Sequence, residues 1–165
     1  MKILLVFFAG IVVAGLVLLL AAFAGLFPTT ATATPPHWEE SLAMRALDAS
    51  LEKRANGLKN PYFTKDAVAL AAGRALYDDN CAGCHGGAKA SSAWGSKGFY
   101  PRVPQFFQEG TDVGPEEAYA AIHDGIRYSG MGAWRDLMKE DDMWKVANFV
   151  ASIKPPKGAP MSKMH

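Results

Sequence analysis

The stretch "DDNCAGCHGG", Asp78 to Gly87, holds both cysteines of the 165-residue chain, Cys81 and Cys84, with His85 directly after the second. Four interpretations of this C-x-x-C pair compete. It could form a zinc site, a redox-active thiol pair, a structural disulfide, or the attachment point of a larger group. The rest of the chain has to discriminate between them.

The first three interpretations each lack a required feature. A structural zinc ion takes four ligands, but there is no further cysteine, and His37, His123 and His165 do not have finger spacing. A thioredoxin-like pair is expected near a βαβ pattern, whereas a helical pattern precedes Cys81. A disulfide across two residues closes so short a loop that it stabilises little. None of the three gives His85 a role.

The fourth interpretation uses all three residues. C-x-x-C-H is typical of c-type haem attachment, in which both thiols bond covalently to the porphyrin and the adjacent imidazole ligates the iron. The motif therefore predicts one haem c, bound covalently through Cys81 and Cys84, with His85 as an axial ligand of the iron.

The second axial ligand must come from elsewhere in the chain. Met131 is the favoured candidate, because it lies in the loop sequence "YSGMGAW" and Gly130 and Gly132 would let its backbone approach the haem closely. Met143 lies on an apolar helical stripe, where a methionine usually fills the core. An open sixth position is an alternative, as are the remaining methionines and histidines after the motif, Met138, Met161, Met164, His123 and His165.

The start of the chain predicts a membrane anchor over residues 1–27. Ile3 to Phe27 is a run of 25 residues without a charge, which is long enough to cross a hydrocarbon core of about 30 Å. A cleavable signal has a shorter apolar region of about 7 to 15 residues, but Ala31 to Ala33 keeps cleavage open as an alternative. Lys2 favours a cytoplasmic N-terminus, which would place the haem domain in the bacterial periplasm on a single-pass anchor.

The rest of the chain predicts four parts. A Pro- and Thr-rich linker over 28–36 precedes a helical extension over 37–61, the haem domain over 62–154 and a flexible tail over 155–165. No stretch alternates for long enough to build a sheet, so the prediction is an all-α fold. The expected helices are His37 to Ala55, Lys65 to Asn80 with Thr64 as N-cap, Gly114-Pro115 to Gly125, and Glu140 to Ile153.

Three blocks in order, "GRALYDDNCAGCHGG", "DGIRYSGMGAW" and "DMWKVANFVASI", resemble the single-domain class I cytochromes c. The resemblance covers Asp66 to Ile153 and implies the small helical cytochrome c fold around a covalent haem. It implies that Gly73 and Tyr77 of the first helix pack against Phe149 of the last.

The same resemblance implies further haem contacts. The carbonyl of Pro104, with Pro101 as the second candidate, would accept the Nδ1 proton of the haem-ligating histidine. Arg102 and Trp134 would donate hydrogen bonds to the haem propionates. A departure is Gly132, which stands where the family often has a proline after the methionine ligand.

The functional expectation is an electron carrier that is not itself an enzyme. A haem enzyme or gas-binding sensor with an open or labile sixth position is the alternative. The expected partners are the inner membrane and a membrane-bound or periplasmic oxidase, reductase or dehydrogenase, more loosely by resemblance to membrane-anchored haem subunits of respiratory enzymes. With 17 Lys and Arg against 16 Asp and Glu, the charge gives no argument for nucleic acid binding.

Overall fold

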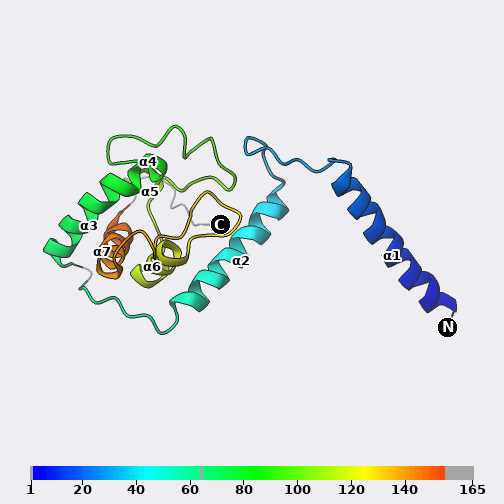
Figure 1. Ribbon diagram of the computed structural model, residues 1–165, viewed down its shortest axis with the longest axis horizontal. Helices are drawn as coiled ribbons and strands as arrows, with labels where there is room; N and C mark the ends of the chain where they lie inside the picture. Colours follow the sequence, from blue (N-terminus) through cyan, green and yellow to red (C-terminus); the bar gives the residue numbers. More distant parts are fainter. Residues whose placement is uncertain (1, 64, 155–165) are drawn as a thin grey trace. The chain divides into compact units, whose positions relative to one another are not determined.

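The computed structural model of the chain describes residues 2–63 and 65–154. These residues form helices and no β-strand, which confirms the prediction of an all-α fold. The chain divides into two compact units between Ala33 and Thr34. The helices, labelled in Figure 1, are α1 (Lys2–Phe23), α2 (His37–Ala55), α3 (Ala67–Asn80), α4 (Ala82–His85), α5 (Phe106–Glu109), α6 (Pro115–Asp124) and α7 (Glu140–Ser152).

The first unit contains α1, and none of the residues in this helix is buried. Its mean hydropathy of 3.2 gives α1 the composition of a membrane-spanning helix or of a signal sequence. The helix ends at Phe23, before the end of the apolar run, because Gly25 adopts a left-handed φ of 70°. The N–H groups of Gly25 and Leu26 donate to the carbonyls of Ala22 and Ala21, at 3.1 and 3.0 Å, as in many helices that end at a glycine.

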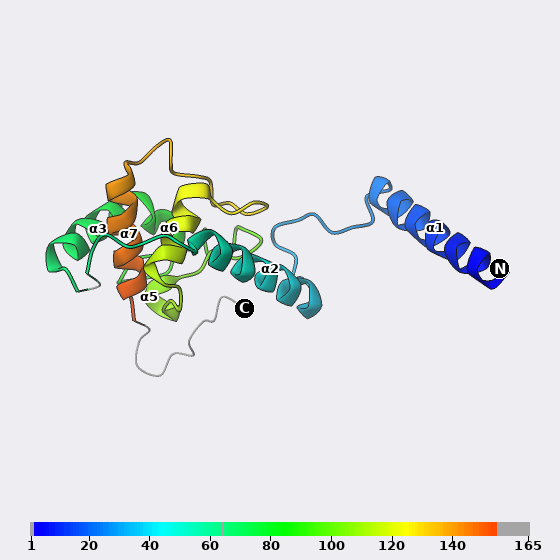
Figure 2. The ribbon, with the colours of Figure 1, turned by 90° about the horizontal axis from the view of Figure 1, so that it is seen from below.

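In the second unit, α3 and α7 lie against each other in both views (Figures 1 and 2) and cross at Gly73. A Cβ on Gly73 would lie 2.1 Å from the carbonyl oxygen of Lys145, so only glycine permits this approach. Beside the crossing, the ring of Tyr77 is completely buried and lies 5.5 Å from the ring of Phe149. The structure therefore has the helix packing that the resemblance implied.

Helix α6 also packs on α7, through Tyr119 and Trp144, whose rings are stacked 3.9 Å apart. It begins at Pro115, as predicted, and the Gly114 N–H donates to the Glu117 carboxylate at 3.1 Å. It ends before Gly125, which has a left-handed φ of 69°. These contacts complete a core of aromatic and aliphatic side chains among α3, α6 and α7.

Helix α2 has the predicted bounds and lies along α6. Leu51 is the buried residue of α2 and is only 2% exposed. After α2 the chain is tied to α7 by Asn60, whose side-chain amide donates to the Asn148 side chain at 2.9 Å. The expected extension is thus part of the same compact unit as the haem motif.

The structure corrects some element boundaries. Helix α3 begins at Ala67 rather than Lys65, because Asp66 is its N-cap and accepts from the N–H groups of Val68 and Ala69 at 3.0 Å each. The predicted cap, Thr64, lies outside the described residues, as does the predicted tail over 155–165. The last helix ends at Ser152, one residue early, and the short helices α4 and α5 were not predicted. The predicted linker, 28–36, contains no helix.

Candidate functional site

The C-x-x-C-H motif forms one tight helical turn at the end of α3. Cys81 is the C-cap of α3 and the N-cap of α4, and its carbonyl accepts from the backbone N–H groups of Cys84 at 3.1 Å and His85 at 2.9 Å. Residues three and four apart lie on one side of a helical turn. Gly86 then ends the turn with a left-handed φ of 72°. The fold therefore presents both thiols and the imidazole from one short element.

The surroundings of the two thiols favour neither a redox pair nor a zinc site. Cys81 and Cys84 are not joined in a disulfide. Burial, together with the neighbouring Cys84, raises the pKa of the Cys81 thiol to about 11, whereas reactive C-x-x-C thiols have lowered pKa values. Within residues 2–63 and 65–154, no group of three or more Cys, His, Asp and Glu side chains is placed to hold a metal ion.

The ring of His85 is fixed by two neighbours. Its Nδ1 lies 3.0 Å from the carbonyl oxygen of Pro104, and the ring stacks on Phe106 at 4.6 Å. Burial lowers the pKa of His85, and the hydrogen bond to Pro104 opposes this only in part. A neutral ring that donates from Nδ1 carries its lone pair on Nε2, which is the state needed to bind a metal. The acceptor is Pro104 and not Pro101.

Tyr77 supports the same turn from α3. Its hydroxyl donates to the carbonyls of Gly86 at 2.8 Å and His85 at 3.3 Å. Burial raises the pKa of Tyr77, so the hydroxyl stays protonated and remains a donor. The residue that packs the helix crossing therefore also holds the backbone of the motif.

Gln105, which was not predicted as a site residue, connects the motif to the Pro104 segment. It is 3% exposed, and its side-chain NH2 donates to the carbonyls of Cys84 at 3.0 Å and Val103 at 2.9 Å. Its side-chain oxygen accepts from the Ser92 N–H at 2.7 Å. The only signal in the sequence is a polar residue directly after Pro104 and before an apolar pair. Gln105 therefore fixes the acceptor of the His85 hydrogen bond relative to the motif.

Replacing Gln105 with leucine is expected to lower the free energy of unfolding by about 2 kcal/mol, because it leaves three partly buried backbone groups without their side-chain partner. Urea titration of the haem-loaded protein would measure the change. Gln108→Leu is the matched control, since the Gln108 side chain donates one hydrogen bond, to the Gly87 carbonyl at 3.2 Å, and its oxygen is buried without a partner among the described residues. An equal loss in both variants would contradict this role for Gln105.

Met131 lies in the segment from Gly125 to Trp134, which we call the Met131 loop. Its carbonyl accepts from the Ile126 N–H at 3.0 Å, and its N–H donates to the Ser129 hydroxyl at 3.1 Å. The Met131 side chain is partly buried and packs against the same core cluster as Cys81 and Phe106. The fold thus brings the predicted second ligand and the motif to one cluster.

The two glycines beside Met131 differ in their surroundings. A Cβ on Gly130 would lie 2.4 Å from the ring of Phe99, so this glycine permits the ring to approach the Met131 loop. A Cβ on Gly132 would meet no heavy atom of the described residues within 4 Å. Close backbone approach is therefore required at Gly130 within the protein itself.

Arg102 and Trp134, the two residues predicted to contact the haem propionates, differ in exposure and in their hydrogen bonds. The Arg102 side chain is exposed and its Nη1 donates to the carbonyls of Lys97 at 2.6 Å and Phe99 at 2.7 Å, which organises its own loop. Trp134 is partly buried against the core, and its backbone N–H donates to the carbonyl of Ile122 at 3.0 Å. Their contact with haem propionates stays a prediction.

Two thiols on one turn, a neutral imidazole oriented through Nδ1 and a helix crossing at a glycine are the features of a c-type cytochrome domain. A family model described as cytochrome c oxidase, cbb3-type, subunit III matches residues 68–150, half of the chain. The chain belongs to this family of c-type cytochromes. Membership implies electron transfer through a covalently bound haem c.

Other comparisons are more distant. The chain is similar to cytochrome CL from the marine methylotrophic bacterium Methylophaga aminisulfidivorans, with 24% sequence identity and a TM-score of 0.44. That likeness covers 61% of this chain and 63% of the other, so it spans less than two thirds of either. No curated protein matches the chain.

Proposed function

We propose that the chain is a membrane-anchored electron carrier with a single haem c. In this proposal Cys81 and Cys84 hold the haem covalently, and His85 and Met131 are the axial ligands. The observation that carries it is the hydrogen bond of 3.0 Å between His85 Nδ1 and the Pro104 carbonyl. It fixes the tautomer that presents Nε2 to iron, and it leaves the imidazole one orientation.

In this proposal some side chains attach the haem, and others set its redox properties. When bound, the haem supplies a one-electron change at iron. The Pro104 carbonyl accepts a hydrogen bond from Nδ1–H. This leaves more electron density on the imidazole ring and so makes His85 a more basic ligand. A histidine and a methionine together favour electron transfer at a raised potential, and they leave no position for a substrate. This is why we propose a carrier rather than an enzyme.

The proposed location is the periplasmic side of the bacterial cytoplasmic membrane. Support comes from the length and hydropathy of α1 and from Lys2 as the only charge before it ends. We propose a membrane-bound or periplasmic oxidase, reductase or dehydrogenase as the partner. The description of the matched family, which names an oxidase subunit, favours the oxidase. Native gels of mildly solubilised membranes, stained for haem, separate a free carrier from a complex subunit.

Replacing Met131 with alanine is expected to abolish the far-red absorption band that a methionine ligand gives to oxidised haem iron. The physical reason is that the band arises from charge transfer between the thioether sulfur and iron, and alanine carries no donor. Absorption spectra of the oxidised wild type and variant would test this. Met138→Leu is the matched control, because Met138 is also partly buried against the core and should leave the band intact.

The same spectra address the alternative of a haem enzyme or gas sensor. That alternative expects a five-coordinate resting spectrum in the wild type, with no far-red band to lose. Such a spectrum, or a band that survives Met131→Ala, would overturn the assignment of Met131.

A further inference from the structure

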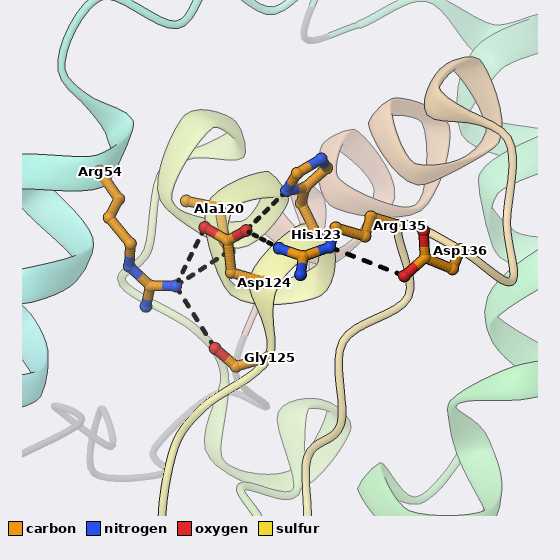
Figure 3. Close-up of polar contacts among 7 residues, drawn as sticks. All are labelled: Arg54, Ala120, His123, Asp124, Gly125, Arg135 and Asp136. Atoms are coloured by element: carbon orange, nitrogen blue, oxygen red, sulfur yellow. Dashed lines mark hydrogen bonds and ion pairs between the residues drawn. The ribbon is translucent and has the colours of Figure 1, made fainter.

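A cluster of charged side chains lies at the C-terminal end of α6, next to the Met131 loop. Figure 3 shows the Asp124 carboxylate between two guanidinium groups, those of Arg54 from α2 and Arg135 from the chain after the loop. The Arg135 Nη1 lies 3.3 Å from Oδ1 of Asp124, and the His123 Nδ1 lies 2.8 Å from the same oxygen. Arg135 also pairs with Asp136 at 3.7 Å.

Arg54 reaches three acceptors through one nitrogen. Its Nη1 lies 3.3 Å from the carbonyl oxygen of Gly125, 3.4 Å from that of Ala120 and 3.5 Å from Oδ2 of Asp124. The Gly125 carbonyl follows the last turn of α6, where backbone carbonyls have no partner within the helix, and a guanidinium there also interacts favourably with the helix dipole. Arg54 Nε is buried without a partner among the described residues, a cost that these contacts must offset. The hydrogen bonds of the Arg54 side chain therefore go to the C-terminal end of α6.

The backbone at this helix end touches Met131 directly. The carbonyl of Gly125 accepts from Arg54. The same residue lies so close to Met131 that a Cβ on Gly125 would be 2.8 Å from the Met131 carbonyl oxygen. The next residue, Ile126, donates its N–H to that same oxygen at 3.0 Å. On the other side, the backbone N–H of Arg135 donates to the His123 carbonyl at 3.3 Å. Arg54 thus contacts the backbone of Gly125, and the backbone of Gly125 and Ile126 contacts that of Met131.

We propose that Arg54 is a positioning residue through which α2 holds the Met131 loop in place on the haem. The inference rests on the proposed function, in which Met131 is an axial ligand. It goes beyond that function because Arg54 lies in the extension, outside the segment that matches the family model, residues 68–150. In this protein the extension has a role in keeping the methionine on the iron, in addition to packing on α6.

Competition by added imidazole measures how firmly Met131 is held, because imidazole can bind the oxidised iron only when the methionine leaves. In the full-length haem-loaded protein, Arg54→Gln is expected to bind imidazole about fivefold more tightly than wild type, as for the loss of a partly buried charge-assisted hydrogen bond. Arg54→Lys keeps the charge and is expected to recover part of this difference. The far-red band should persist at neutral pH in both variants without imidazole.

Two control variants separate this role from general destabilisation. Arg45→Gln removes an exposed arginine from the same helix and should leave imidazole affinity unchanged. Glu116→Ala removes the acceptor of the Asn60 N–H at the opposite end of α6, so it should lower the unfolding midpoint without changing imidazole affinity. If Glu116→Ala tightens imidazole binding as much as Arg54→Gln, the inference is overturned.

Met131→Ala distinguishes failure of this inference from failure of the proposed function. If that variant keeps the far-red band or the wild-type imidazole affinity, Met131 is not the ligand and both ideas fail. If it behaves as expected while Arg54→Gln binds imidazole like the wild type, only the role of Arg54 fails.

Discussion

Alanine in place of Gly73 is expected to destabilise the folded protein strongly. Gly73 is in the interior of α3, where an alanine would ordinarily stabilise a helix by about 0.5 to 1 kcal/mol. Here the added methyl group would lie 2.1 Å from the carbonyl oxygen of Lys145 and 2.9 Å from Cβ of Phe149. The first of these atoms belongs to the backbone of α7, so no side-chain rotation can make room. We expect a net loss of about 3 kcal/mol or more.

Urea denaturation of the haem-loaded protein, followed by far-ultraviolet circular dichroism, would measure the loss. Arg74→Ala is the matched control, because it places an alanine at the next position of α3, on the exposed side. It removes only an exposed ion pair with Asp78, which is worth about 0.5 kcal/mol at most. A Gly73→Ala protein as stable as the Arg74→Ala protein would contradict the close crossing of α3 and α7.

The double replacement Cys81→Ala and Cys84→Ala is expected to remove the haem from the chain under denaturing conditions. The wild type should keep its haem in a denaturing gel, because thioether bonds survive unfolding. Without the two thiols, only axial ligation and packing would hold the haem, and both are lost on unfolding. Peroxidase staining of the gel for haem, together with the mass of the intact chain, would measure attachment.

A single replacement is the control for this experiment. Cys84→Ala leaves the Cys81 thiol in place, and one bond should keep some haem on the denatured chain. A wild-type mass without a haem, or a double variant that still stains, would refute covalent attachment at these cysteines. Either result would return the pair to the other interpretations of C-x-x-C.

Helix ends were predictable where the sequence carries an unambiguous signal. Pro115 and Gly125 bound α6, and the apolar spacing of α7 matches its buried face. The start of α3 was missed because Thr64 and Asp66 are both good caps, and the pattern does not rank them. The four-residue helices α4 and α5 are too short for a periodic pattern to show.

The candidate site divides in a similar way. Cys81, Cys84 and His85 follow from a local motif, and Pro104 follows from a resemblance. Gln105 and Arg54 could not be predicted, because their partners lie up to 71 residues away in the sequence. The residues next to a buried glutamine or arginine in the sequence do not reveal its hydrogen-bond partners, because these partners come from distant segments that meet only in the folded protein.

Under the proposed function, the segment between α1 and α2 limits how far the haem unit can move from the membrane. Thirteen residues separate Phe23 from His37, and a fully extended chain of that length reaches at most about 45 Å. Under the proposed function, every encounter with a partner then takes place in a thin layer beside the membrane. Confinement of this kind raises the effective concentration of two tethered proteins to about the millimolar range. Electron delivery in such a layer depends on the density of partners in the membrane and hardly at all on their number per cell volume.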